Sequence, residues 1–208
     1  MRNLTLHKFL AMLLMTVSCA TLSVAQNVAQ IGTKGYATLK AAVYDATAGR
    51  QTVVTLINDV DLTTDDELEV GKLQNIVLDM NGYSIKGANA DHKNICVSSG
   101  KLTLMDSKEN STGKIYAETP YQEGIYDKPL VEVINGGEFV MESGHISSVP
   151  AGNLQFVIGA YYDSKVIING GTIKSGGYAI NGSNDEYQSP TITINGGTLV
   201  STSSYAIS

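Results

Sequence analysis

Six carboxylate side chains lie close together in the segment 59–69 and could supply hard oxygen ligands to Ca²⁺: Asp59, Asp61, Asp65, Asp66, Glu67 and Glu69. Calcium sites of the EF-hand type place such ligands at fixed positions of a single loop. The segment has neither that spacing nor the Gly-Gly-x-Gly-x-Asp repeat of calcium-binding β-helices. We therefore expect a solvated turn here, and the sequence predicts no metal and no cofactor.

A pair of carboxylates acting as general acid and general base would suit glycan hydrolysis. Asp79 and Glu142 occupy the same position in copies of a repeated segment, and the last two copies place Asn169 and Asn195 there. The two carboxylates are two copies apart, or roughly 10 Å at the spacing of β-strands. We therefore interpret this position as structural, and we predict that Asn169 and Asn195 form a ladder of hydrogen-bonded amides.

The two histidines outside the first 25 residues, His92 and His145, lie beside expected turns. No motif pairs either of them with a serine, a cysteine or a carboxylate, so both are interpreted as surface residues. The sequence predicts no catalytic residue and favours a non-catalytic protein over an enzyme.

Aromatic and acidic side chains gather in a segment that interrupts the repeat, and five of them are the predicted carbohydrate-binding residues: Tyr116, Tyr121, Glu123, Tyr126 and Asp127. Tyrosine rings stack on sugar faces, and carboxylates accept hydrogen bonds from sugar hydroxyls. The alternative is a loop that folds its tyrosines over the neighbouring turn and shields the core. Both interpretations stay open at this point. Tyr161-Tyr162 is a second aromatic pair.

Residues 1–25 have the features of a secretory signal peptide. A basic start is followed by an apolar run over 9–17 and by small residues at positions 23 and 25. The run is too short to cross a bilayer, which needs about 20 residues, and no later segment is apolar enough to anchor the chain. We predict a secreted or cell-surface protein with no transmembrane span. A lipoprotein attached through Cys19 is the alternative.

The charge of the chain after removal of this leader argues against nucleic acid as a partner. Fourteen basic residues less Arg2 and Lys8 leave twelve, which face twenty Asp and Glu and give a net charge of −8. An acidic surface repels phosphate backbones. Cys96 is then the sole cysteine, which excludes an intramolecular disulfide, and its apolar neighbours predict a packed, unreactive thiol.

A short strand followed by small residues recurs along the chain. Five copies share an apolar-x-apolar pattern: Ile76-Val77-Leu78, Leu102-Thr103-Leu104, Phe139-Val140-Met141, Val166-Ile167-Ile168 and Ile192-Thr193-Ile194. Their third residues are separated by steps of 26, 37, 27 and 26, and Val54-Thr55-Leu56 is a weaker first copy. The long step leaves about eleven additional residues in the aromatic segment. A second strand is expected in each repeat, at 95–97, 131–133, 156–158, 178–180 and 205–207.

Strands this short, separated by Asn-Gly and Gly-Gly corners, satisfy their backbones by stacking each strand on its equivalent in the next repeat. Alternation then points apolar residues into a narrow core and polar residues to water. The sequence therefore predicts an all-β fold, a right-handed parallel β-helix, with glycines at corners that require positive φ or close packing.

One helix is predicted ahead of the repeats. From Thr38, apolar residues recur at helical spacing, with Thr38 as the N-cap and Gly49 as the stop. A stack of β-coils has an exposed end that needs cover, so we expect this amphipathic helix to cap the N-terminal end. The predicted organisation is a signal peptide over 1–25, an N-terminal strand and capping helix over 26–52, and β-helix coils over 53–208.

The chain resembles bacterial secreted β-helix proteins of the pectin-lyase-like superfamily, many of which are adhesin-like surface proteins. The similarity covers 36–42, 53–60, 76–85 and 100–107 together with the two Asn-Gly-Gly-Thr copies. These are strand and corner residues, so they imply a fold rather than an activity. Lyases of the superfamily use arginine and lysine beside calcium-binding aspartates, whereas Arg50 is the only arginine after the leader.

The expected function is therefore a non-catalytic, secreted or surface-displayed protein that binds a polysaccharide, a cell-surface glycan or another surface partner. Two alternatives stay open. The chain could be the N-terminal part of a polysaccharide lyase or hydrolase with catalytic coils beyond Ser208, or a purely structural stalk. Because no closing helix follows the last strand, we also expect a truncated C-terminal end, or self-association through its open edge.

Overall fold

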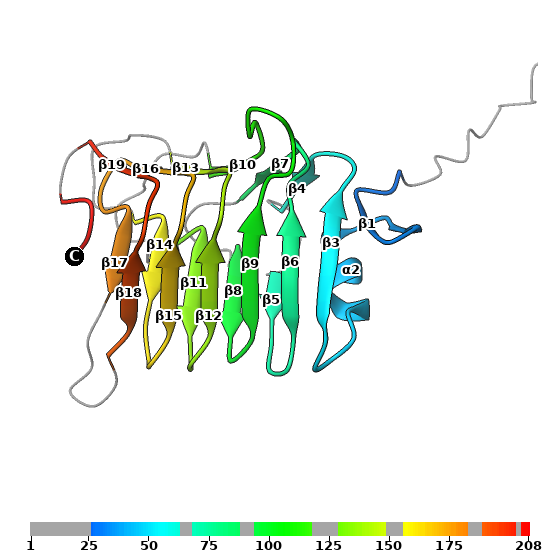
Figure 1. The fold of residues 1–208 in the computed structure, drawn as a ribbon, viewed down its shortest axis with the longest axis horizontal. Coiled ribbons are helices and arrows are strands. Elements are labelled where there is room, and N and C mark those ends of the chain that lie inside the picture. The colour runs from blue at the N-terminus through cyan, green and yellow to red at the C-terminus, as the bar shows by residue number, and fades with distance from the viewer. Residues whose placement is uncertain are drawn as a thin grey trace, which may run out of the picture.

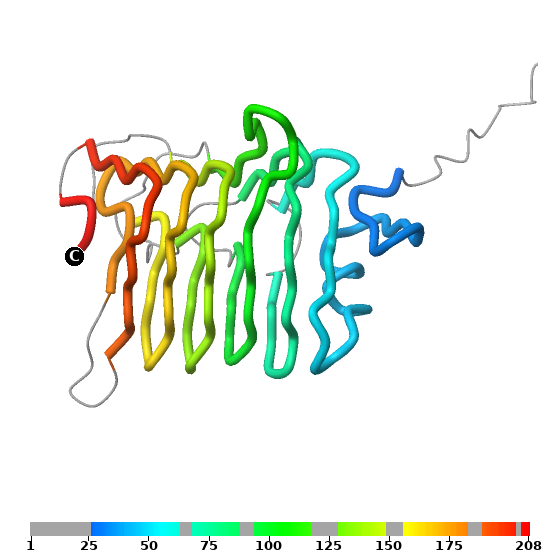
Figure 2. Tube along the Cα trace, viewed as in Figure 1, coloured from blue at the N-terminus to red at the C-terminus, as the bar shows by residue number. Residues whose placement is uncertain are grey.

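The structure is a computed structural model that describes residues 26–62, 68–87, 94–117, 129–148, 156–182, 189–202 and 205–208. The first 25 residues, including the predicted signal peptide and Cys19, lie outside these ranges. The described chain is a β-solenoid that winds repeatedly through three sheets, here named A, B and C (Figure 1). Its turns stack as successive layers along the long axis of the molecule (Figure 2). The predicted parallel solenoid is thus confirmed.

Each full turn contributes one strand to each sheet, in the order A, B, C. Sheet A holds β1 (Ala29–Ile31), β2 (Lys34–Tyr36), β3 (Gln51–Leu56), β6 (Asn75–Asp79), β9 (Lys101–Met105), β12 (Glu138–Met141), β15 (Lys165–Ile168) and β18 (Thr191–Ile194). Sheet B holds β4 (Val60–Asp61), β7 (Ser84–Lys86), β10 (Lys114–Ala117), β13 (His145–Ser148), β16 (Thr172–Ser175) and β19 (Thr198–Ser201). Sheet C holds β5 (Leu68–Val70), β8 (Ile95–Ser98), β11 (Val131–Ile134), β14 (Ile158–Ala160) and β17 (Ile180–Gly182).

The predicted repeat corresponds to sheet A. The third residues of the five copies form one column across the parallel strands: Leu78, Leu104, Met141, Ile168 and Ile194. The weaker first copy is displaced, because Val54 rather than Leu56 pairs with Leu78. A shift of two residues keeps the same side chains pointing inward, so the core face of the strand is unchanged.

The second strands predicted at 95–97 and 131–133 are confirmed as β8 and β11, but each turn also has a third strand that was not predicted. The strands of sheet B were missed. Each carries one large inward side chain, such as Ile115 or Ile146, beside small ones such as Ser148 and Ser175, both of which are buried. A single large apolar residue in a short strand gives too weak an alternation to reveal it.

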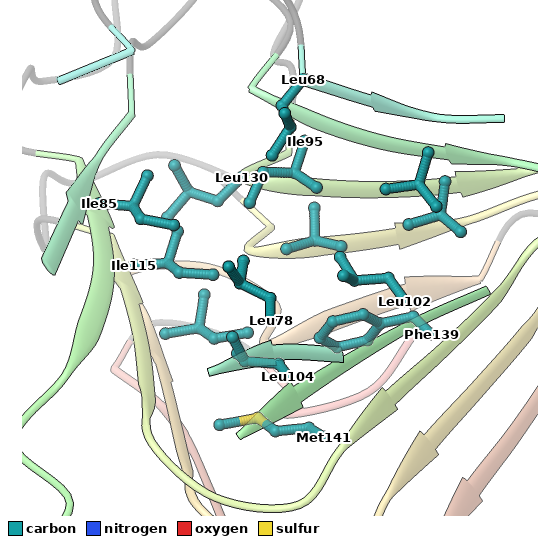
Figure 3. Packing of buried hydrophobic residues seen from close by; sticks show 14 of the residues in the cluster. Leu68, Leu78, Ile85, Ile95, Leu102, Leu104, Ile115, Leu130, Phe139 and Met141 are labelled. Carbon is teal, nitrogen blue, oxygen red and sulfur yellow. The ribbon is translucent and has the colours of Figure 1, made fainter. Parts of the chain in front are cut away.

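Side chains from all three sheets meet in one apolar core. Phe139, which is fully buried, lies among leucines and isoleucines that project inward from different sheets (Figure 3). The inward columns continue with little interruption up to β17, whereas Ile194 in β18 is 41 % exposed. The core therefore becomes open to solvent at the last described turn.

The N-terminal unit consists of the β1–β2 hairpin and helix α2 (Leu39–Asp45). Strand β1 pairs antiparallel with both β2 and β3 and so extends the edge of sheet A. Helix α2 buries Leu39, Ala42 and Val43 and packs against β1, β2 and β5. Figure 1 shows this unit at the end of the stack opposite the C-terminus.

The helix begins as predicted and ends earlier than predicted. The Thr38 side chain accepts a hydrogen bond from the Ala41 N–H at 3.1 Å, which confirms the N-cap. The helix stops at Asp45 and not at Gly49. Gly49 has φ +73 and donates its N–H to the Leu73 carbonyl at 2.7 Å, so it joins the corner of the first turn. Only a short helix fits before that connection.

Acidification is expected to weaken this N-terminal unit. Lys34 Nζ lies 2.8 Å from Asp45 Oδ2, and the Tyr36 hydroxyl donates to the same oxygen. The hydrogen bonds from Lys34 and then Tyr36 hold the pKa of Asp45 below its usual value. The stabilisation is therefore complete above the unfolded pKa of about 3.9 and is lost as the pH falls through the lower folded pKa.

Thermal melts of the wild type and of Asp45→Asn at about pH 7 and about pH 3 measure this effect. We expect the wild type to melt at the higher temperature near pH 7 and the gap between the two melting temperatures to narrow at about pH 3. A gap that is equally large at both pH values would contradict the role assigned to the Asp45 carboxylate. The effect is small because the pair is exposed and screened.

Candidate functional site

Asp79, one of the two carboxylates considered for acid–base chemistry, stabilises a corner of the solenoid. Its Oδ1 accepts hydrogen bonds from the backbone N–H groups of Asn81 and Ser107, both at 3.0 Å. Its Oδ2 accepts from the Ser107 hydroxyl at 2.8 Å. Asp106 has a similar role, because it accepts hydrogen bonds from the N–H groups of Gly82, Lys108 and Gly113. Both carboxylates are buried and occupied by backbone contacts between sheets A and B.

The predicted asparagine ladder is confirmed and is longer than expected. Asn195 Nδ2 donates to Asn169 Oδ1 at 2.8 Å, and Asn169 Nδ2 donates to Glu142 Oε1 at 2.9 Å. Met105 lies between Asp79 and Glu142 in this column, so the two carboxylates are two turns apart as predicted. Glu142 therefore ends a structural ladder on the outer face of sheet A.

The acidic segment 59–69 is divided between sheets. Asp59 Oδ1 accepts the Ser84 N–H at 2.8 Å, while Asp61 faces outward from β4 and Glu69 faces outward from β5. Asp65, Asp66 and Glu67 lie outside the described residues. Within the described ranges, no group of three His, Cys, Asp or Glu side chains is placed to hold a metal ion.

Charges on the outer surface are sorted by sheet. From β7 to β19 the outward positions of sheet B carry no carboxylate, and three of them carry a positive charge: Lys86, Lys114 and Lys174. His145 lies among them on β13. The outward positions of β5 and β11 in sheet C instead hold Glu69 and Glu132. Cys96 lies buried on this outer side of sheet C and not in the central core. The outward face of sheet B from β7 onward is therefore basic, although the chain as a whole is acidic.

Of the five predicted sugar-binding residues, Tyr116 lies within the described ranges. It faces outward from β10 on sheet B and is partly exposed. Lys114 Nζ lies 4.2 Å from the centroid of its ring, a cation–π contact. Register places Lys86 and Ser147 beside Tyr116 on the neighbouring strands. The other predicted members, Tyr121, Glu123, Tyr126 and Asp127, lie outside the described residues, as does His92.

The aromatic pair Tyr161-Tyr162 lies at the corner that connects sheet C to sheet A. The ring centroids are 6.4 Å apart and the rings are tilted by 50°. A Cβ added at Gly159 would lie 2.8 Å from atoms of the Tyr161 ring, so this ring covers the outer side of Gly159. Burial, followed by the nearby charges of Glu132 and Tyr162, raises the pKa of Tyr161 to about 12. Its hydroxyl stays protonated at neutral pH.

Within the described part of the chain, no helix is long and apolar enough to span a membrane. The chain matches no protein-family profile, no curated protein and no solved structure.

Proposed function

We propose that this chain is an exported, non-catalytic β-solenoid protein that binds glycans at the cell surface or outside the cell. The observation that carries this proposal is the outward-facing Tyr116 ring on sheet B, with the Lys114 ammonium 4.2 Å from its centroid. A tyrosine ring offers an apolar face for a sugar, and a neighbouring ammonium donates hydrogen bonds to hydroxyl or carboxylate oxygens. Export is proposed from the leader-like residues 1–25.

The setting of Tyr116 favours binding because its strand lies inside a regular sheet. Strand β10 is hydrogen-bonded on both sides, to β7 and to β13, and Ile115 anchors it in the core. A site built on regular strands needs little ordering when a ligand arrives, so less binding free energy is lost to conformational entropy. Ser147 and Lys86, beside Tyr116 in register, add polar groups along the direction of stacking.

A non-catalytic role is supported by the use made of the buried acids. Asp79 and Asp106 accept hydrogen bonds from corner backbone and hydroxyl groups. A general acid or base has to exchange a proton with substrate. These carboxylates are instead committed to holding successive turns together.

We also propose that α2 with the β1–β2 hairpin caps the N-terminal end of the stack. The support is that α2 buries three apolar side chains and that β1 pairs with the edge of β3. Membership of the pectin-lyase-like superfamily and a right-handed coil are proposed on the sequence resemblance described above.

Replacing Tyr116 by Ala is expected to weaken binding to an immobilised polysaccharide by about tenfold, because the stacking surface is removed. Retardation in native gels that contain the polysaccharide provides the measurement. Tyr44→Ala is the matched control, since Tyr44 is 88 % exposed on α2 at the far end of the molecule. The double variant Tyr121→Ala/Tyr126→Ala tests the remaining predicted aromatics in the same assay.

Equal retardation of the wild type and all three variants would remove Tyr116 and the neighbouring loop from the proposed site. Absence of retardation of the wild type in every polysaccharide would overturn glycan binding itself. Release of sugar products by the wild-type chain would instead favour the alternative of a polysaccharide-cleaving enzyme.

A further inference from the structure

The corner between β14 and β15 places bulky residues at positive φ, where the equivalent corner one turn earlier has Asn-Gly. Asn135-Gly136 connects β11 to β12 with φ values of +52 and +74. The equivalent residues one turn later are Tyr162 and Asp163, with φ values of +53 and +57. The equivalence follows from the register, because Val133 pairs with Ala160 and Glu138 pairs with Lys165. The paired residues are five positions apart in both turns, so Asn135 corresponds to Tyr162 and Gly136 to Asp163. The Gly136 N–H also donates to the Tyr162 carbonyl at 2.9 Å.

Two consecutive residues in the left-handed region are disfavoured for L-amino acids with bulky side chains. Asn-Gly is the pair that adopts this geometry most readily, because glycine has no Cβ and asparagine tolerates positive φ. Neither residue is buried in the core, since Tyr162 is 46 % exposed and Asp163 is exposed as well. Strained residues kept without a packing benefit are characteristic of functional positions.

The strained corner presents an aromatic surface on a fixed support. The Tyr161 ring is held over Gly159 on the outer side of sheet C, where the absence of a side chain leaves room for it. The Tyr162 ring extends from the same corner, with its centroid 6.4 Å from that of Tyr161. One ring is therefore anchored on the sheet and the other is displayed to solvent.

Carboxylates accompany these rings. Glu132 lies beside Gly159 in the strand register, close enough that its charge acts on the Tyr161 hydroxyl. Asp163 follows Tyr162 directly and is exposed. Carboxylates accept hydrogen bonds from sugar hydroxyls, whereas they repel the acid groups of uronic acids and sulfated sugars. The combination fits an uncharged sugar better than an anionic one.

We propose that Tyr161, Tyr162 and Asp163, together with Glu132, form a binding site for a neutral sugar unit of a polysaccharide. This site rests on the proposed glycan-binding function and lies on a different sheet from Tyr116. The ring of Tyr162 stacks on the sugar. The carboxylates of Asp163 and Glu132 accept hydrogen bonds from the hydroxyl groups of the sugar. The strained corner is retained because it displays these groups.

The neighbouring turn supplies the variant that tests this site. Tyr162→Asn/Asp163→Gly copies the Asn135-Gly136 corner into the next turn without changing its length. We expect the double variant to melt about 2–4 °C higher than the wild type, because the backbone strain is relieved. We also expect the affinity for neutral polysaccharides to fall by about tenfold. Affinity gels that contain xylan, glucomannan or mixed-linkage β-glucan measure this loss.

Controls separate this proposal from glycan binding in general. Tyr44→Asn removes a more exposed tyrosine elsewhere and should leave affinity unchanged, and polygalacturonate serves as the anionic comparison probe. Unchanged affinity of the double variant for the neutral probes, or a lower melting temperature, would overturn the site while leaving glycan binding intact. Wild-type binding to polygalacturonate alone would overturn its assignment to neutral sugars. A wild type that binds no probe would overturn the proposed function together with the site.

Discussion

Replacing Gly100 by Ala is expected to lower the free energy of unfolding by about 3 kcal/mol, because overpacking against fixed backbone cannot relax. A Cβ at this position would lie 2.4 Å from the Gly71 carbonyl oxygen and 2.7 Å from that of Val70. Both oxygens belong to the preceding turn, whose backbone is held by the parallel ladders of β5 with β8 and of β6 with β9. The turns would have to separate locally to accommodate one methyl group.

Gly71→Ala is the matched control for this substitution. It adds the same methyl group at the same kind of corner, but its nearest neighbours, side-chain oxygens of Glu69 and Gln74, are 3.8 and 3.9 Å away. Urea unfolding followed by far-ultraviolet circular dichroism measures both variants. Losses of the same size for Gly100→Ala and Gly71→Ala would show that close approach between turns does not limit the residue at position 100.

Replacing Asp106 by Ala is expected to cost about 3–5 kcal/mol, since three N–H donors lose a charged acceptor in a largely buried place. The carboxylate is 7 % exposed and accepts hydrogen bonds from Gly82, Lys108 and Gly113. These donors belong to two successive connections between sheets A and B. Loss of these hydrogen bonds would therefore weaken the contact between the two turns as well as the corner that contains Asp106.

Asp106→Asn and Glu109→Ala are the comparison variants for the stability loss of Asp106→Ala. Asparagine keeps one acceptor oxygen, so we expect an intermediate loss, whereas Glu109 is exposed on the same connection and its removal should cost little. Chemical unfolding of the three variants and the wild type gives the ranking. If Asp106→Ala were as stable as Glu109→Ala, the carboxylate would not hold the corner.

The sequence was most informative about sheet A and least informative about sheet B. Strands of sheet A carry two inward apolar residues, such as Ile76 and Leu78, so their alternation stands out. Strands β13 and β16 of sheet B bury one isoleucine beside a serine, and small residues such as Ser175 also occur in loops. Burial of a serine depends on the width of the solenoid at that point, which is a property of the assembled turns.

The register between strands of successive turns was the second feature that the sequence did not predict correctly. The predicted second strands aligned Ile95 with Phe156, whereas Ile95 and Ile158 are equivalent through their common partner Val131. Both alignments point apolar side chains inward, because they differ by two residues. The choice between them depends on the lengths of the intervening connections and on hydrogen bonds between turns, neither of which a short apolar pattern encodes.

The candidate sites were only partly predictable. The sequence identified Tyr116 as an aromatic candidate, but its outward direction and its contact with Lys114 depend on a strand of sheet B that was missed. Tyr161-Tyr162 was recognised as a pair, whereas its strain became visible only when Tyr162 was matched to Asn135 through the register. Aligning corners as well as strands would have revealed this substitution from the sequence.

In the described residues, each parallel strand pairs with its equivalents in the turns directly before and after it, and this has a consequence for the order of folding. Each new turn closes a short chain segment onto an edge that already exists. The entropic cost of loop closure rises only slowly with length, so it is met in small steps even in the longer turn. The first parallel edge, β3, is itself supported by β1. A chain that emerges from a narrow channel N-terminus first would meet a template at every stage, and it would not need its last turn in order to fold its first.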